Sequence, residues 1–271
     1  MKAATHDKTL AALTAPLVLF LAVPVVALVL RALLGGGLWA ALTSQVVLHA
    51  LALSLTTTAV SLTLTLVFGT PLAYVLARRP FRGSSFVETI VDLPIVLPPS
   101  VAGLALLFVL GRRGLIGDAL DVFGIVIPFT TLAVILAQTF VAVPFFVRSA
   151  RAGIAAVDRD IEDAARVDGA SERAVFRWVT VPMASAALAA GAVMSWSRAL
   201  GEFGATIMFA GNIEGRTQTL PLVVYSEFGG GDLDASVAAA AILVIAAFGV
   251  LASVRVLRWG RALDIRSALP G

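Results

Sequence analysis

The amino-acid sequence predicts an all-α integral membrane protein with six membrane-spanning helices and a helical loop on the cytoplasmic side. Two features of the composition predict this fold class: apolar side chains make up 59% of the 271 residues, and charged side chains make up 14%. Soluble domains carry about 25% charged residues, and the mean hydropathy here is +0.96. A third observation predicts the loop, because residues 148–178 hold twelve charged side chains between two apolar segments.

Six apolar segments are long enough to cross a bilayer, which takes about 20 residues. The first follows Lys2 and Lys8, as the core of a signal peptide would. Its apolar run exceeds the usual signal-peptide core of about 7–15 residues, and no clear small-x-small cleavage site follows, so we interpret it as a retained helix. The six spans form a single predicted domain, 1–271, and cover approximately 10–31, 50–77, 88–110, 127–147, 179–210 and 234–257.

Lysine and arginine set the orientation of the spans, because cytoplasmic loops are enriched in both residues. With the amino terminus inside, the cytoplasmic segments contain fifteen basic residues. The outside segments contain four, namely Arg31, Arg112, Arg113 and Arg216. Both termini and the loop 148–178 are therefore predicted to be cytoplasmic. The predicted location is the cell (inner) membrane, which the chain crosses several times and where lipid surrounds it.

Several kinds of chemistry are excluded by residues that the sequence lacks. The chain has no cysteine, and His6 and His49 are far apart, so no disulfide, thiol nucleophile or metal-ligand cluster is predicted. A phosphate-binding loop needs Gly-x-x-x-x-Gly-Lys-Ser/Thr. The two lysines, Lys2 and Lys8, do not stand in that pattern. We therefore predict no catalytic residue, no P-loop ATPase activity and no cofactor in this chain.

The charged loop is predicted to form two short helices joined by a turn. Asp158 or Asp160 can cap the first helix, Gly169 suits a left-handed position after its end, and Ser171 can cap the second helix. One interpretation places this pair on the membrane surface, where arginines meet acidic lipids. However, six acidic side chains between 158 and 172 would be repelled there. A protein partner explains the mixed charge better.

The segment from Asp163 to Pro182 resembles the EAA loop of ABC importer permeases. The family pattern is Glu-Ala-Ala, three residues, Gly, nine residues, Ile, one residue, Leu-Pro. The same spacings occur here, with Asp in place of Glu and two valines in place of Ile and Leu. The resemblance implies a type I permease whose loop docks into a cleft of an ATPase subunit, and Glu162 can share the acidic role. The coupling residues implied are Glu162, Asp163, Ala164, Ala165, Gly169, Ala170, Ser171 and Pro182.

Two further segments, 93–107 and 197–225, resemble the molybdate permeases among the oxyanion importers. This resemblance implies transport of a tetrahedral oxyanion, molybdate or the chemically similar tungstate, with sulfate or thiosulfate as the alternative. It also implies a homodimer that moves substrate along its interface by alternating access. The implied partners are two ABC ATPase subunits, which hold ATP and magnesium, and an external oxyanion-binding protein. No nucleic-acid partner is implied.

Candidate residues of the pathway can be chosen from the sequence itself. Arg198 and Glu202 stand four apart on one helical face, so they can pair, either beside the path or as a buried structural bridge. Ser54, Thr58 and Ser61 form a hydroxyl stripe along the second span. This stripe either lines an anion path or, as membrane packing favours, makes hydrogen bonds between helices.

The third span and one outside loop supply the remaining candidates. Pro98 and Pro99 must distort the third span, because each lacks an N–H group and crowds the preceding turn. With Ser100 beside them, the distortion is either a gate element or a passive kink. Arg216 is the basic residue of an outside loop, where it either meets the arriving oxyanion or is simply solvated.

Two other classes of protein are alternatives to the importer. An ion-coupled secondary transporter would favour intramembrane carboxylates and an internal repeat. The sequence has Glu202 deep in a span and no evident repeat. A membrane enzyme would need a metal-ligand cluster or a nucleophile–base pair, and none is evident. Both alternatives leave the charged loop without a role.

Overall fold

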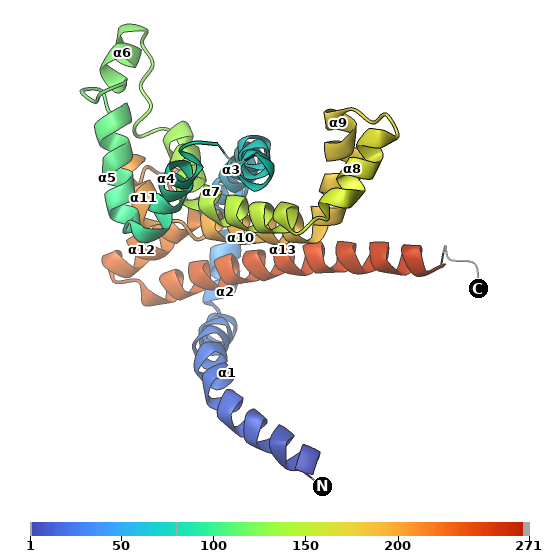
Figure 1. The fold of residues 1–271 in the computed structure, drawn as a ribbon. Helices are drawn as coiled ribbons and strands as arrows, with labels where there is room; N and C mark the ends of the chain where they lie inside the picture. Colours follow the sequence, from blue (N-terminus) through green and yellow to red (C-terminus); the bar gives the residue numbers. More distant parts are fainter. Residues whose placement is uncertain (1, 80, 268–271) are drawn as a thin grey trace.

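The computed structural model describes the backbone of residues 2–79 and 81–267, and the side chains of 13–79 and 81–252. Figure 1 shows that this part of the chain is built from helices. The first half contains α1 (Lys2–Leu34), α2 (Gly37–Thr43), α3 (Gln45–Arg78), α4 (Ser84–Val96), α5 (Pro99–Leu110), α6 (Gly117–Val122) and α7 (Thr131–Ala155). The second half contains α8 (Arg159–Val167), α9 (Glu172–Val175), the π-helix η1 (Phe176–Thr180), α10 (Val181–Leu200), α11 (Gly204–Phe209), α12 (Leu220–Gly230) and α13 (Leu233–Ser267).

The described helices contain the predicted number of spans. Five are long and apolar enough to cross a membrane, within α1, α3, α7, α9–α10 and α13, and the bent pair α4–α5 supplies a sixth if it counts as one span. The predicted all-helical membrane fold is therefore confirmed over this part of the chain.

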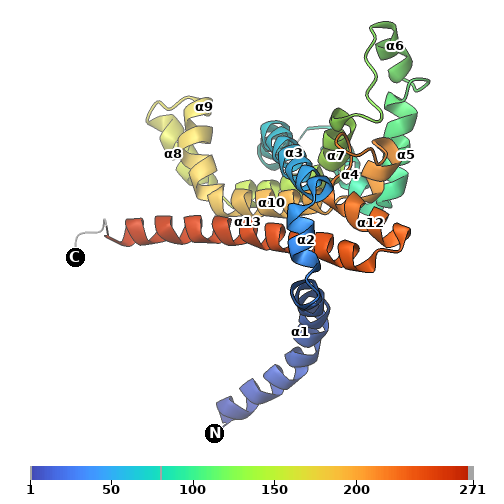
Figure 2. The same ribbon diagram turned by 180° about the vertical axis from the view of Figure 1, so that it is seen from behind.

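The centre of the bundle is formed by α3, α7 and α10, which pack closely against one another. Small residues allow this approach. A Cβ atom at Gly153 would lie 2.3 Å from Ala187 Cβ, and one at Gly191 would lie 2.8 Å from Ser149 Cβ. Close contact through glycine and alanine is a common way for membrane helices to associate. In Figures 1 and 2, α8 and α9 lie at one end of this bundle, and α5, α6 and α11 lie at the other.

Two of the predicted spans are broken, the third near its middle and the fifth towards the end that is predicted to face outward. The third, 88–110, consists of α4 and α5, which are bent by 118°. Pro98 precedes α5 and Pro99 begins it, where a missing N–H group costs nothing. The predicted distortion is confirmed, and it is far larger than a kink. The fifth, 179–210, ends as α10 at Leu200 and resumes as the short helix α11.

Other boundaries differ from the sequence prediction because hydropathy measures apolar length and not helix length. Helix α7 continues to Ala155, so residues 148–155 belong to it, and the loop proper begins at Ala156. Helix α13 continues to Ser267, beyond the predicted end near 257. The sequence prediction does not include α12, a helix of 11 residues in a segment that is predicted to face outward.

Candidate functional site

The charged loop folds as the predicted pair of short helices. Asp158 caps α8, its Oδ1 accepting from the N–H of Asp160 at 3.0 Å. Gly169 follows the end of α8 with φ +92°, in the left-handed region that favours glycine. Ser171 caps α9, its Oγ accepting from the N–H of Ala174 at 3.3 Å. Each local signal therefore has the predicted geometry, and α8 and α9 project together from the bundle (Figure 1).

Glu162 points from α8 into the bundle. Its side chain is 2% exposed and accepts a hydrogen bond from Arg78 Nη2 at 3.2 Å, forming an ion pair. The hydroxyl of Thr180, in η1, donates to the same carboxylate at 2.6 Å. Arg78 Nη2 also donates to the carbonyl of Val157 at 2.7 Å. The carboxylate expected to share the outward acidic role thus lies inside the molecule.

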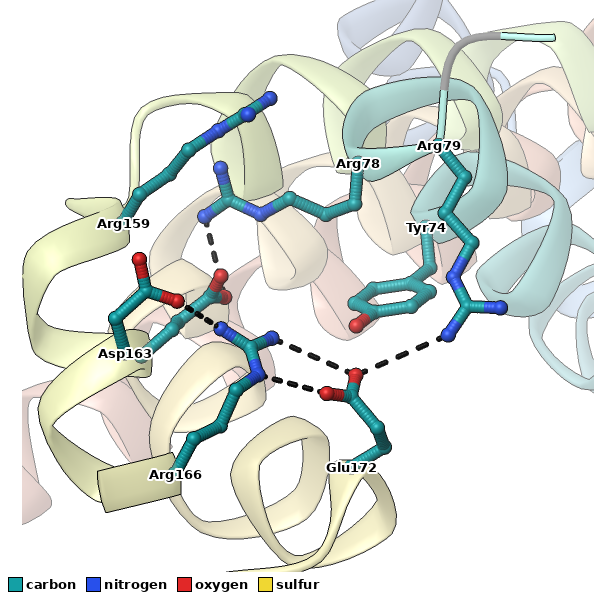
Figure 3. Close-up of a pocket in the computed structure, with 8 residues that line it drawn as sticks. Tyr74, Arg78, Arg79, Arg159, Asp163, Arg166 and Glu172 are labelled. Atoms are coloured by element: carbon teal, nitrogen blue, oxygen red, sulfur yellow. Dashed lines mark hydrogen bonds and ion pairs between the residues drawn. The ribbon is translucent and has the colours of Figure 1, made fainter.

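The neighbouring carboxylate, Asp163, is much more exposed, at 67% of its side chain. It accepts from Arg166 at 2.6 Å, and Arg166 donates at 2.7 Å to Glu172, which also lies 3.8 Å from Arg79. Hydrogen bonds from Arg166 to Glu172 and Asp163 hold the pKa of Arg166 above its ordinary value. Figure 3 shows these groups around a cavity of about 210 Å³ lined by Tyr74, Arg78, Arg79, Arg159, Glu162, Asp163, Arg166 and Glu172.

The outer surface of the loop combines small and apolar residues. Ala164 is exposed, Val167 is 87% exposed, and a Cβ atom added at Gly169 would meet nothing within 4 Å. Ala165 and Ala170 are half-buried. Pro182 is exposed near the start of α10. An uncovered surface of this kind can enter a groove of another protein.

The predicted pairing of Arg198 and Glu202 is present at the other end of α10. Arg198 Nη1 lies 2.6 Å from Glu202 Oε2, and the side chains are 29% and 1% exposed. Glu202 Oε1 also accepts from the N–H of Ala205 at 2.8 Å, in the first turn of α11. The carboxylate therefore joins the end of α10 to the start of α11. Its assignment to the transport path stays a prediction.

The hydroxyl stripe on α3 lies inside the described protomer. Ser54, Thr58 and Ser61 are all 0% exposed. Ser54 Oγ accepts from the N–H of Leu220 at 2.8 Å, and Ser61 Oγ accepts from the hydroxyl of Thr139 at 3.1 Å. These contacts favour the alternative in which the stripe joins helices, and a place on the anion path stays a prediction.

The remaining pathway candidates lie near the outer end. Pro98 and Ser100 are exposed and Pro99 is half-buried at the α4–α5 bend. The bend packs on α11, because a Cβ atom at Gly204 would lie 2.8 Å from Pro99 Cβ and one at Gly103 would lie 2.5 Å from the carbonyl oxygen of Ala205. Arg216 is exposed, and its carbonyl accepts from Thr131 Oγ1 at 2.9 Å.

Sequence reasoning missed the residues that hold the loop and α4 to the bundle. Neither Arg78 nor Thr180 is among the site residues predicted from the sequence. Arg148 donates to both carboxylate oxygens of Asp92, at 2.6 and 2.8 Å, joining α7 to α4. Arg151 and Glu88 pair at 2.9 Å between the same helices. The sequence shows charged residues near the predicted cytoplasmic ends of these spans. Their spacing does not indicate which of them pair with one another.

A bundle of membrane-spanning helices that carries an exposed pair of capped helices at one end and broken spans towards the other is the architecture of a membrane permease. Residues 69–262 match the family described as "Binding-protein-dependent transport system inner membrane component", and the chain belongs to this family. Its two broken spans and its loop all lie within the matched residues.

Similar proteins include a molybdenum transport permease and a probable sulfate transport permease. The chain is 42% identical over 230 residues to the molybdenum transport system permease protein ModB of Mycobacterium tuberculosis, covering 85% of this chain and 86% of that protein. It is 40% identical over 186 residues to a probable sulfate transport system permease protein of Chlorella vulgaris, covering 68% and 70%. A bacterial alginate ABC transporter solved with its pentasaccharide-bound periplasmic protein shares the fold, with a TM-score of 0.74, 19% identity and 93% and 94% coverage.

Proposed function

We propose that this chain is the membrane permease subunit of an ATP-driven importer for a tetrahedral oxyanion, with molybdate as the substrate and tungstate as its chemical equivalent. The family match and the molybdenum permease relatives support this proposal. The proposal that transport is driven by a partner ATPase rests on the loop. Its capped helices present an uncovered surface of small residues at one end of the bundle.

The proposed assembly contains two copies of this chain, two ATPase subunits and an external oxyanion-binding protein. ATP and magnesium are held by the ATPase subunits, and both termini and the loop face the cytoplasm. The distribution of basic residues supports the orientation, and two-fold symmetry is the commonest arrangement for such assemblies. The alginate transporter solved with its periplasmic protein is a structural relative with a partner of this kind.

In the proposed cycle, movement of the ATPase subunits reaches the spans through the loop and opens the path alternately to each side. The two broken spans, α4–α5 and α10–α11, are the gate elements, because non-helical backbone is tolerated in a membrane where it lines a cavity or is buried in protein. Pro98, Pro99 and Ser100 belong to this gate, and Arg198 offers a partly exposed guanidinium beside it. Arg216 attracts the arriving anion.

Sulfate is the second candidate substrate, because identity to the sulfate permease is nearly as high as to the molybdenum permease. The deciding experiment is uptake and ATP hydrolysis by the reconstituted complex, with its binding protein, for molybdate, tungstate and sulfate separately. We expect molybdate and tungstate to stimulate both activities at concentrations where sulfate does not. Stimulation by sulfate alone would show that the substrate is sulfate and not molybdate. Uptake that needs an ion gradient and no ATP would instead establish a secondary transporter.

A further inference from the structure

The attachment of α8 to the rest of the protein is unusual, because it depends on a charged side chain. Glu162 is the buried residue of this helix, all of whose residues are described. The apolar side chains of α8 do not replace it: Ile161 is 44% exposed and Val167 is 87% exposed. A helix held by a few directional polar contacts is fixed in register and orientation, whereas apolar contacts alone would allow it to slide or rotate.

The Glu162 contacts bring together four segments that are separate in the sequence. Arg78, in the last turn of α3, reaches both Glu162 on α8 and the carbonyl of Val157, just beyond α7. Thr180 reaches Glu162 from the last residue of η1, directly before α10. Tyr74 and Phe176 add an edge-to-face ring contact between α3 and η1, with centroids 4.9 Å apart. The end of α3, the end of α7 and the start of α10 therefore meet at the carboxylate of Glu162 and the guanidinium of Arg78.

The pair is well protected from water, with side-chain exposures of 7% for Arg78 and 2% for Glu162. It adjoins an apolar cluster that includes Ala73, Leu76, Ile154 and Val157. Although both residues also line the cavity, separating the two largely buried charges would leave each without its partner, which favours persistence of the contact while the protein moves. Figure 3 shows Asp163 and Glu172 paired with Arg166 around the same cavity, and both carboxylates are more exposed, at 67% and 56%.

We propose that Glu162 is a positioning residue for coupling: through Arg78 and Thr180 it fixes α8 to the inner ends of α3, α7 and α10, so that the loop and these helices move as one body. The inference rests on the proposed function, in which an ATPase moves the loop. It assigns different tasks to two adjacent carboxylates. Asp163 is exposed and available to the ATPase, and Glu162 carries the movement into the spans. A variant that lacks the Glu162 carboxylate is therefore expected to hydrolyse ATP without transporting the anion.

The first test measures oxyanion uptake per ATP hydrolysed by the reconstituted complex. The Glu162→Gln variant removes the charge, and the double variant Arg78→Met with Glu162→Leu removes the pair without leaving an unpaired buried charge. We expect ATP hydrolysis to stay within about twofold of wild type and uptake per ATP to fall by about tenfold or more. Thr180→Val, which loses one hydroxyl, should lower this ratio by about threefold. Asp160→Asn is the control, an exposed carboxylate of the same helix, and its loss should leave the ratio unchanged.

The second test uses the absence of cysteine from the sequence. Spin labels on Asp160→Cys in α8 and Val75→Cys in α3 report the distance between the two helices, both sites being exposed. Labelled chain is diluted with unlabelled chain so that distances between copies do not contribute. With wild-type Glu162 we expect the same narrow distance distribution with and without the non-hydrolysable analogue AMP-PNP, and a broad one in Glu162→Gln.

Normal uptake per ATP in both Glu162 variants, or a narrow distribution in Glu162→Gln, would overturn the proposal. A wild-type distance that changes when AMP-PNP binds would also overturn it, because the loop and α3 would then move separately. The distance measurement needs no transported anion. Failure of the wild-type complex to take up molybdate would therefore refute the proposed substrate and leave this proposal to be decided by the distances.

Discussion

The two ends of α10 are each joined to the protein by a buried glutamate paired with arginine, yet the two junctions are built differently. At the inner end, Glu162 and Arg78 are 84 residues apart in sequence and are 2% and 7% exposed. At the outer end, Glu202 and Arg198 are one helical turn apart and are 1% and 29% exposed. The inner pair ties distant helices together, whereas the outer pair lies within one break between two consecutive helices.

The difference suggests different mechanical roles for the two ends. A junction that joins α3, α7, α8 and α10 resists relative movement of all four. A break held by a local ion pair and close glycine contacts can change internally without disturbing the rest of the bundle. We therefore expect the inner end to transmit movement and the outer end to open and close.

The largest effect is expected from Gly169→Asp at the docking surface. A Cβ atom there meets nothing within this chain, so the change costs the protein itself about 1 kcal/mol of backbone strain. In the assembled transporter the new carboxylate would be buried unpaired against the ATPase. We expect uptake to fall by about a hundredfold and ATPase binding to weaken, with insertion unaffected. Uptake by cells and co-purification of the ATPase measure both.

Gly231→Asp is the matched control for that substitution. Gly231 also has positive φ, at +86°, and open space around its Cβ position, but it lies between α12 and α13 at the outer end. The same backbone strain should leave uptake within about twofold of wild type. Equal losses in the two variants would show that strain, and not docking, explains the Gly169 result.

The next largest effect is expected on the stability of the protein when one partner of either ion pair is removed. Arg78→Ala leaves Glu162 uncompensated in a buried site, and we expect a loss of about 3–5 kcal/mol in the free energy of unfolding. Arg198→Ala should cost less, about 1–2 kcal/mol, because Arg198 is 29% exposed and water can approach its site. Thermal unfolding of the purified variants in detergent measures the difference. Equal destabilisation would contradict the distinction between the two junctions.

A smaller effect is expected where the broken spans meet. A Cβ atom at Gly103 would lie 2.5 Å from the carbonyl oxygen of Ala205, so Gly103→Ala must push α5 away from α11. Overpacking of this kind costs about 1–3 kcal/mol. We expect reduced uptake together with unchanged ATPase binding. Gly229→Ala, where nothing lies within 4 Å, is the control that should behave as wild type.

The features that could be predicted from the sequence are those set by neighbouring residues. The caps at Asp158 and Ser171, the left-handed Gly169 and the pair Arg198–Glu202 all depend on groups within a few positions of one another. The chemistry of two consecutive prolines likewise predicts a break in the third span. It does not predict the angle of 118°, which depends on how α5 packs against α11.

The features that could not be predicted depend on which helices become neighbours. Nothing in the spacing of Arg78, Glu162 and Thr180 indicates that they meet, because the contact forms only when α3, α8 and η1 end at one point. The burial of Glu162 is an example: the local pattern places it beside Asp163 in an acidic pair, and tertiary packing buries Glu162 while leaving Asp163 67% exposed.

The smallest effect is expected from Arg216→Ala in the outside loop. The guanidinium is exposed, and the loop is held through the Arg216 carbonyl, which the substitution keeps. We expect uptake at low substrate concentration to fall by about twofold to fivefold, with a weaker dependence on salt, because a surface charge mainly affects the rate of encounter. ATPase binding should be unchanged. Loss of ATPase binding would place this loop on the wrong side of the membrane.

The docking role of the loop is tested most directly by labelling a single cysteine at Ser171 with a membrane-impermeant thiol reagent. Ser171 is exposed at the start of α9, and Glu214→Cys, in the exposed outside loop, serves as the control. We expect Ser171→Cys to be labelled only from the cytoplasmic face and to be protected when the ATPase subunits bind, with Glu214→Cys labelled from outside and never protected. Labelling of Ser171→Cys in intact cells, or equal labelling with and without the ATPase, would contradict the docking role.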